Sequence, residues 1–159
     1  PKTFSILKDL YKYFRVYITA NMGAADYTAL AEIELLNIDT NSTDITTTTT
    51  PVTVSSFYDA YPTAASLVDN AAKTVASPNV WATATGAGNR APCWFVVELP
   101  YRTKLYAIRM WSQFSLPARA PKDFVVQGSN NGTTWTNIKT FTNTPTWVDN
   151  TAKTFTLYS

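Results

Sequence analysis

The sequence has no histidine and a single cysteine, Cys93. These two absences exclude a Ser-His-Asp triad, a Cys-His nucleophile, a histidine-ligated zinc site and any disulfide within the chain. Charged residues make up only 15% of the 159 residues, and 13 basic against 11 acidic side chains leave a net charge of +2. Because no basic block of five residues occurs, we expect no nucleic-acid partner.

Long hydrophobic runs are also missing. No apolar stretch approaches the roughly 20 residues that a membrane span needs, and the first residues lack the charged and apolar regions of a signal peptide. We therefore expect no membrane insertion. The chain starts at Pro1 rather than at methionine, which favours a processed chain or a piece of a longer one.

Threonine is the most over-represented residue, with 26 copies, and 14% of the chain is aromatic. Both residue classes favour pleated, half-buried surfaces, so the composition predicts an all-β domain. Period-2 alternation supports this prediction at residues 14–19 and 31–35. Six further short runs rich in Val, Ile, Phe, Trp or Thr raise the number of expected strands to eight: 52–57, 94–99, 105–111, 124–128, 135–141 and 153–157.

Turn and loop signals separate these runs. Residues 129–133 (Ser-Asn-Asn-Gly-Thr) predict a hairpin, since Asn and Gly tolerate the positive φ that a tight turn requires. Residues 64–68 fit one helical turn, and the polar stretch 37–51 fits a loop or an edge strand. Many short strands with such signals indicate a sandwich or a barrel.

One short motif occurs twice. Residues 2–6 (Lys-Thr-Phe-Ser-Ile) return as residues 153–157 (Lys-Thr-Phe-Thr-Leu), 151 positions later. Either this is coincidence in a threonine-rich chain, or the chain is one unit of a tandem array cut just beyond its repeat. On the second interpretation, residues 1–10 are a leading strand or a remnant of a preceding repeat, and residues 11–159 form a single domain.

Several blocks of the chain resemble the discoidin family, also called coagulation factor five/eight C-type domains. The matching blocks are residues 54–57, 67–70, 81, 94–99, 108–110 and, most specifically, 121–135 (Pro-Lys-Asp-Phe-Val-Val-Gln-Gly-Ser-Asn-Asn-Gly-Thr-Thr-Trp). Residues 13–16 and 31–34 resemble the family's closing strands but stand at the front, so the order looks circularly permuted. Residues 17–21 are similar to modules of bacteriophage tail-fibre and virion proteins. The resemblance implies a discoidin-like fold: an antiparallel eight-stranded jelly-roll β-sandwich.

Strand directions predict which loops share an end of the sandwich. If each strand runs once from one end of the sandwich to the other, alternate connections along the chain lie at the same end. Counting from the hairpin places residues 20–28, 57–63, 86–92, 112–122 and 142–151 together at the opposite end. This end collects aromatic and arginine side chains of the kind that bind sugars. The candidate ligand-binding residues are Tyr58, Tyr61, Arg90, Trp111, Phe114, Arg119 and Trp147, with Asn21, Asn89 and Gln113 as hydrogen-bonding partners.

Structural explanations remain open for many of these residues. Trp81, Trp94 and Trp135 stand where the family keeps tryptophans of the core or of a hairpin, so we expect them to be structural. Trp111 either contacts ligand or caps the core. Arg90 and Arg119 are alternatively solvated charges in loops, and Tyr58 and Tyr61 alternatively fill space between loops.

A structural Ca²⁺ is the expected cofactor, if there is one. Asp69, a carboxylate of Glu32 and loop carbonyls are its candidate ligands, because calcium takes six to eight oxygen atoms. The resemblance places the calcium of carbohydrate-binding members in this region. A solvated sheet face is the alternative explanation for Glu32.

Three functions fit these features. The first is a non-catalytic module that binds a cell-surface glycan, in a phage tail fibre or another extracellular or virion-surface adhesin. The second is a structural module in a repeat array or a homo-oligomeric fibre, without glycan binding. The third is a glycoside hydrolase, which would need two carboxylates about 5 to 10 Å apart, and we do not expect an enzyme.

Overall fold

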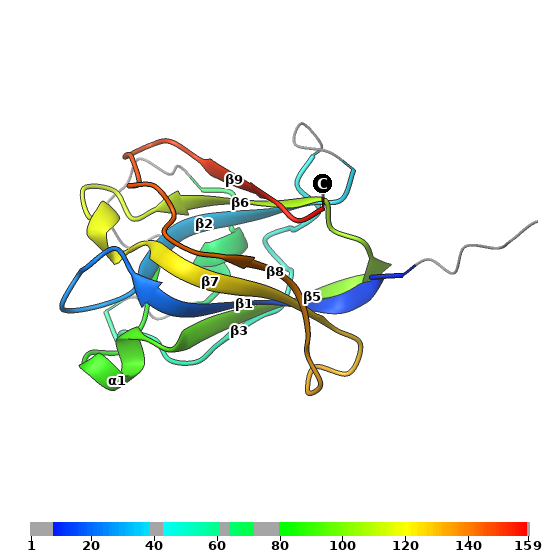
Figure 1. The fold of residues 1–159 in the computed structure, drawn as a ribbon, viewed down its shortest axis with the longest axis horizontal. Helices are drawn as coiled ribbons and strands as arrows, with labels where there is room; N and C mark the ends of the chain where they lie inside the picture. The colour runs from blue at the N-terminus through cyan, green and yellow to red at the C-terminus, as the bar shows by residue number, and fades with distance from the viewer. Residues whose placement is uncertain (1–7, 39–42, 61–63, 72–79, 159) are drawn as a thin grey trace, which may run out of the picture.

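The computed structural model describes residues 8–38, 43–60, 64–71 and 80–158. Nine strands form two antiparallel sheets within these ranges, and they stack as two layers in Figure 1. The elements in chain order are β1 (Tyr11–Asn21), β2 (Ala29–Leu36), β3 (Val52–Val54), η1 (Ala64–Val68), β4 (Trp81–Ala82), α1 (Ala87–Arg90), β5 (Cys93–Thr103), β6 (Ala107–Ser112), η2 (Pro117–Arg119), β7 (Pro121–Ser129), β8 (Thr136–Phe141) and β9 (Lys153–Thr156).

The five-stranded sheet has the order β3-β5-β1-β7-β8, with β1 at its centre. Strand β1 is central because its alternation buries one face along most of its length: Phe14, Val16 and Ile18 point to the core. Val16 stands opposite Phe95 of β5 on one side and Val126 of β7 on the other. The register therefore aligns the buried residues of three neighbouring strands.

The four-stranded sheet has the order β4-β2-β6-β9. Its central pair is β2 and β6, in which Ile33 stands opposite Met110 and Leu35 opposite Ile108. Strand β9 is added at the edge, where Phe155 stands opposite Ile108. All five side chains belong to the core between the sheets.

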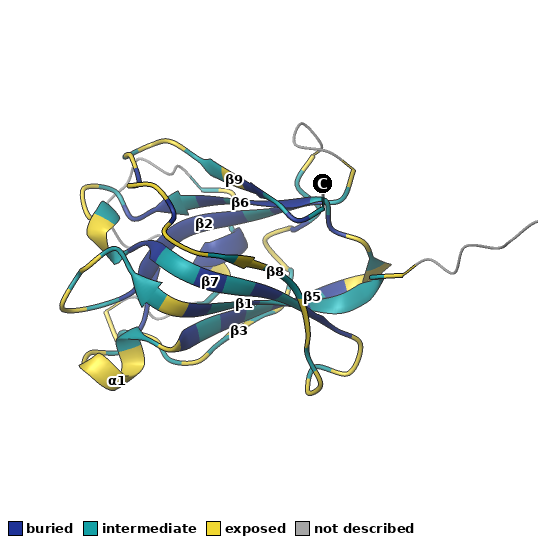
Figure 2. Ribbon diagram, viewed as in Figure 1, coloured by how far each residue is buried: buried dark blue, intermediate teal, exposed yellow. Residues whose placement is uncertain are grey.

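Aromatic side chains fill much of that core, and Figure 2 shows buried residues along the strands of both sheets. Trp81 is fully buried and meets Phe95 edge to face, with ring centroids 5.8 Å apart. Phe124 stacks on Phe141 at 5.0 Å and meets Phe155 edge to face at 4.9 Å. These contacts join the two sheets.

The predicted all-β fold is confirmed, and every one of the eight predicted strands is present. The additional strand in the described ranges is β4, two residues long and too short to show alternation. Residues 64–68 form the 3₁₀ helix η1, as their sequence indicates. Residues 43–51 form a loop in which Asp44 Oδ1 accepts the Leu35 and Thr46 N–H groups. Residues 1–7, which carry the first copy of the repeated motif, lie outside the described residues.

The strand registers determine which connections share an end. Strand β1 ends at Asn21 opposite Pro121, where β7 begins, and Ile18 stands opposite Cys93, where β5 begins. Strand β2 begins at this same end, because the hydroxyl of Thr28, directly before β2, donates to the carbonyl of Arg90, which lies just before β5. No helix in the described part of the chain is long and apolar enough to cross a membrane.

Candidate functional site at the loop end

Five connections meet at one end of the sandwich, on the left in Figure 1. They are the β1–β2 loop, the segment after β3, the segment from β4 through α1 to β5, the β6–β7 loop with η2, and the β8–β9 loop. The strand count from sequence predicts this same grouping. We refer to this region as the loop end.

The β1–β2 loop is fixed onto the residues beside η2 by main-chain bonds. Met22 N–H donates to Ala120 O at 2.9 Å, and Ala24 N–H donates to Ala118 O at 3.1 Å. The Asn21 side-chain amide donates to Ala24 O and to Tyr27 O within its own loop. The predicted sugar-binding role of Asn21 is therefore not supported, because its amide N–H groups already hold the loop together.

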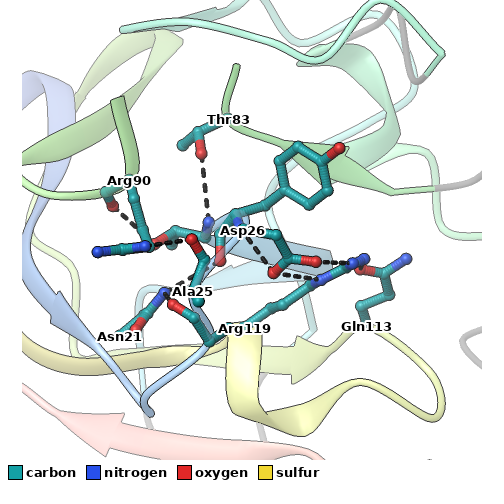
Figure 3. A network of polar contacts seen from close by, with 10 residues as sticks. Asn21, Ala25, Asp26, Thr83, Arg90, Gln113 and Arg119 are labelled. Carbon is teal, nitrogen blue, oxygen red and sulfur yellow. Dashed lines mark hydrogen bonds and ion pairs between the residues drawn. The ribbon is translucent and has the colours of Figure 1, made fainter. Parts of the chain in front are cut away.

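Arg119 joins two loops through its planar guanidinium (Figure 3). Its Nε donates to Asp26 Oδ1 at 3.1 Å, its Nη2 donates to Asp26 Oδ2, and its Nη1 donates to Gln113 Oε1 at 3.0 Å. The Arg119 side chain is only 13% exposed, whereas that of Asp26 is 45% exposed. Arg119 therefore links the β1–β2 loop to the β6–β7 loop from a largely buried position, and Asp26 is the member of the pair that faces solvent.

The hydrogen bond from Arg119 lowers the pKa of Asp26 below its ordinary value. The Tyr27 N–H adds a second stabilising bond to the same carboxylate, at 2.8 Å. Asp26 is thus ionised at neutral pH. A carboxylate has about four acceptor positions, so it retains capacity for ligand hydroxyl groups after accepting these three bonds.

Two tyrosine rings lie beside this ion pair. The rings of Tyr27 and Tyr58 are 4.8 Å apart at 44°, and the Arg119 guanidinium carbon lies 4.8 Å from the Tyr27 centroid. A hydrogen bond to Tyr58 raises the pKa of the Tyr27 phenol. The main chain of Tyr58 is fixed by its N–H bond to Ala82 O at 2.9 Å. Both rings are partly exposed and are held in place by neighbours from other loops.

Arg90 is the last residue of α1 and points back to the β1–β2 loop. Its Nη1 donates to Ala25 O, and its own carbonyl accepts the Thr28 hydroxyl at 2.7 Å (Figure 3). The Asn89 amide donates to Thr85 O at 2.8 Å. Arg90 and Asn89 are therefore placed at the predicted end, but their contacts stabilise the loops.

The prediction that Trp147 contacts ligand is wrong. The indole is 2% exposed, its Nε1 donates to Pro121 O at 2.9 Å, and its ring packs 5.9 Å from that of Phe155. The β8–β9 loop turns the Trp147 side chain inward, where the ring covers the apolar core beside Phe155 and excludes water from it. Lys153 lies over the ring at 5.5 Å.

The other candidates are more dispersed. Trp111 lies on β6 opposite Glu32, on the face that alternation turns away from the core, and is partly exposed. Phe114 is a partly exposed residue of the β6–β7 loop. It follows the buried Gln113 and precedes Ser115, and the N–H of Ser115 donates to Asp149 Oδ1. Tyr61 lies outside the described residues. Ligand contact by Trp111, Phe114 and Tyr61 stays a prediction.

The two candidate calcium ligands behave differently. Asp69 follows η1 and uses Oδ1 to accept the Ala71 N–H at 2.8 Å, whereas Glu32 is fully buried on β2. In the described ranges, no three acidic, cysteine or histidine side chains gather around one point. These ranges therefore do not complete a calcium site, and residues 72–79, next to Asp69, lie outside them. Calcium binding stays a prediction.

Three carboxylates of the loop end, those of Asp26, Asp123 and Asp149, accept hydrogen bonds from the loops themselves. Asp123 Oδ1 accepts the Asn143 N–H at 2.6 Å, and Asp149 Oδ1 accepts the Ser115 N–H at 3.0 Å. A general acid needs a raised pKa, whereas that of Asp26 is lowered. These contacts favour structural roles for Asp123 and Asp149, whereas Asp26 is an ionised carboxylate that faces solvent.

Sequence reasoning missed Tyr27, although its position in a loop rich in turn residues offered a signal. Trp94, expected from the resemblance to be structural in the core or beside a hairpin, instead lies partly exposed on the outer face of the five-stranded sheet. Trp81 is in the core, as expected, and Trp135 packs beside the hairpin over Arg15. The missed signal for Trp94 was alternation: its neighbours Cys93 and Phe95 occupy the buried positions.

A family model described as NedA-like, galactose-binding domain, of the factor five/eight type C group, matches residues 66–158. The chain belongs to this discoidin family. The match begins inside η1 and covers β4 through β9, so it includes Arg90, Trp111 and Arg119 but not Tyr27 or Tyr58. No curated protein and no solved structure matches the chain. Membership in the discoidin family agrees with the two-sheet fold and with carbohydrate binding as its class of function.

Proposed function

We propose that the chain is a non-catalytic module that binds a galactose-type glycan at its loop end. The observation that carries this proposal is the pair of partly exposed tyrosines, Tyr27 and Tyr58, beside the exposed and ionised carboxylate of Asp26. Membership in a family described as galactose-binding supports the choice of sugar.

The chemistry of this group suits a sugar. The axial hydroxyl of galactose leaves one face of the ring rich in C–H bonds, and such a face packs on an aromatic ring. The hydroxyls at the edge of the sugar donate hydrogen bonds, which an ionised carboxylate accepts strongly. Arg119 and Gln113 hold Asp26 in place before the ligand arrives, so binding does not have to order this side chain.

The biological setting is part of the proposal. A cell-surface glycan is the expected partner, and an extracellular or virion-surface protein such as a phage tail fibre is the expected context. A shallow site of this kind binds weakly by itself. Neighbouring repeats or a homo-oligomeric fibre would raise its effective affinity through multivalency, by about 10²- to 10⁴-fold.

Titration calorimetry with galactose and lactose tests the proposal, preceded by a glycan array. Tyr58→Ala should weaken binding about tenfold, which corresponds to about 1.4 kcal/mol. Tyr101→Ala is the matched control, because Tyr101 is 57% exposed and lies toward the end of β5 remote from the loop end. Asp26→Asn should also weaken binding, since it removes the charged acceptor.

Equal affinities for the Tyr58 and Tyr101 variants would contradict the proposed site. Absence of any glycan binding by the wild-type protein, on the array and by calorimetry, would instead favour the structural module of a repeat array.

A further inference from the structure

The outer face of the five-stranded sheet carries a second set of aromatic side chains, separate from the Tyr27, Tyr58 and Asp26 group of the loop end. Tyr13, Arg15 and Tyr17 of β1 point outward, because the residues between them are buried. Each stands opposite an outward residue of β5: Tyr13 opposite Glu98, Arg15 opposite Val96 and Tyr17 opposite Trp94. We refer to this surface as the sheet face.

A groove of about 240 Å³ runs over the sheet face. Thr53 and Val96, paired across β3 and β5, lie along it, and Trp94 and Trp135 contribute aromatic rings. A second depression of about 270 Å³ shares Pro51 and Glu98 with the first. The two together form a surface longer than either depression alone.

Arg15 fixes the geometry of one side of the groove. Its guanidinium carbon lies 4.3 Å from the centroid of Trp135 and 5.4 Å from that of Tyr17, and its Nε donates to Gln127 Oε1 at 2.7 Å. Desolvation by these neighbours lowers the pKa of Arg15, which remains charged at neutral pH. Within the described part of the chain, Nε is the one Arg15 nitrogen that makes a hydrogen bond, so both Nη groups are available to a ligand.

Glu98 supplies the opposite charge. Its Oε1 accepts Lys12 Nζ at 2.7 Å and the Tyr13 hydroxyl at 3.2 Å, and the hydrogen bond from Lys12 lowers the pKa of the Glu98 carboxyl. The side chain is 37% exposed. Among contacts between described residues, Oε2 accepts none. The groove thus combines aromatic rings with an oriented donor and an oriented acceptor.

These polar groups decide which ligand the groove suits. A proline-rich peptide would cover the rings, but prolines lack N–H groups and would leave Glu98 Oε2 without a donor under an apolar ligand, which costs free energy. A sugar chain covers the rings with its C–H faces. Its hydroxyls can accept hydrogen bonds from the Arg15 guanidinium and donate them to the Glu98 carboxylate. We infer that the sheet face is a second glycan-binding site, which takes an extended neutral polysaccharide through Trp94, Trp135, Arg15 and Glu98.

The rigidity of the support strengthens this inference. Trp94 is held within β5 by mutual bonds with Ser55, whose N–H donates to Trp94 O and whose hydroxyl accepts the Trp94 N–H. Side chains on strands keep their geometry better than side chains on loops. A site on this face is also open at its sides, which a polymer requires and a single sugar does not.

Affinity electrophoresis in gels that contain xylan or mixed-linkage β-glucan, whose backbones contain no galactose, tests the inference. We expect at least one polymer to retard the wild-type protein. Trp94→Ala and Trp135→Ala should each weaken that retardation at least tenfold. Tyr101→Ala, the exposed control, and Tyr58→Ala, the loop-end variant, should retain it. Circular dichroism confirms the fold of each variant.

Glu98→Gln provides a milder second variant if a tryptophan variant fails to fold. It keeps the size of the side chain and removes the charged acceptor, so we expect binding to fall several-fold. Assigned indole N–H signals in NMR give an independent readout, because the polymer should shift those of Trp94 and Trp135 and leave that of the buried Trp81 in place.

The outcomes separate this site from the loop end. Retardation that Tyr58→Ala abolishes and the tryptophan variants retain would overturn the second site in favour of one site at the loop end. Shifts of Trp94 and Trp135 with decaproline, without retardation by any polymer, would overturn it in favour of a peptide site. Retardation through the tryptophans without galactose binding would support it while the loop-end proposal fails.

Discussion

Replacement of Trp147 is the sharpest test of where the structure departs from the sequence. The sequence predicts a ligand-binding ring in a loop, and the structure buries that ring at 2% exposure against Phe155. Because the indole is buried, Trp147→Ala should destabilise the fold. Trp147→Phe should destabilise it less, and galactose binding by the folded Phe variant should be unchanged.

The expected magnitude follows from burial and one hydrogen bond. A buried tryptophan removes about 150–250 Å² from water, and truncation of such a side chain to alanine costs about 3–5 kcal/mol. The Phe variant loses the indole bond to Pro121 O, worth about 0.5–1.5 kcal/mol, and part of the ring volume. The Thr144 hydroxyl also donates to that carbonyl, at 3.1 Å, so Pro121 O keeps a partner. We expect about 1–2 kcal/mol for Trp147→Phe.

Urea unfolding followed by circular dichroism measures these differences, and the melting temperature of the Ala variant should fall by about 6–20 °C. Trp111→Ala is the matched control, because Trp111 is partly exposed and should cost clearly less than Trp147→Ala. The reasoning is refuted if Trp147→Ala unfolds within about 1 kcal/mol of wild type. Loss of glycan binding in that stable variant would restore the ligand-binding prediction.

Three further predictions follow from single groups. The folded-state pKa of Asp26 lies below its ordinary 3.8, so the stabilisation from its bonds to Arg119 is present above that pH and lost as the pH falls through the folded value. Because the pair is partly exposed, we expect it to contribute less than about 1 kcal/mol to the free energy of unfolding. The unfolding free energy of Asp26→Asn should therefore depend less on pH in the acid range than that of the wild type. Equal acid dependence of the two proteins would contradict this prediction. Burial raises the pKa of Cys93 to about 12, so a thiol reagent at pH 8 should label it only after unfolding, and rapid labelling of the folded protein would show that it is exposed. If Asp69 binds calcium, calcium in excess over EDTA should stabilise the wild type, by about 2.7 kcal/mol when its concentration is a hundred times the Kd. The same addition should not stabilise the Asp69→Asn variant. Equal melting temperatures of the wild type with and without calcium would exclude the site.

Much of the fold is predictable because strands leave a local signal. Alternation at residues 14–19 sets which side of β1 is buried, and the turn residues at 129–133 end β7 where the structure ends it. The grouping of loops at one end follows as well, since it needs only the number of strand crossings. The two-residue β4 carries no such signal, because two residues cannot show a period.

The site is predictable only in part. Sequence places Tyr58, Arg90 and Arg119 at the loop end, but it does not show that both arginines are occupied by Ala25 and Asp26. Those contacts join loops more than 60 residues apart, so they depend on the relative placement of strands in three dimensions.

Composition and local period were enough to predict the all-β class, the excluded chemistries and the loops that share an end. The tertiary structure decided which aromatic rings serve the core and which face solvent. Trp147 sits in a loop yet closes the core, and Trp94 sits in a strand yet faces outward. Burial is a property of what packs on a residue: Trp147 is covered where its loop meets Phe155 of β9 and Pro121 of β7, which no local period predicts, whereas the outward position of Trp94 follows from the alternation of β5.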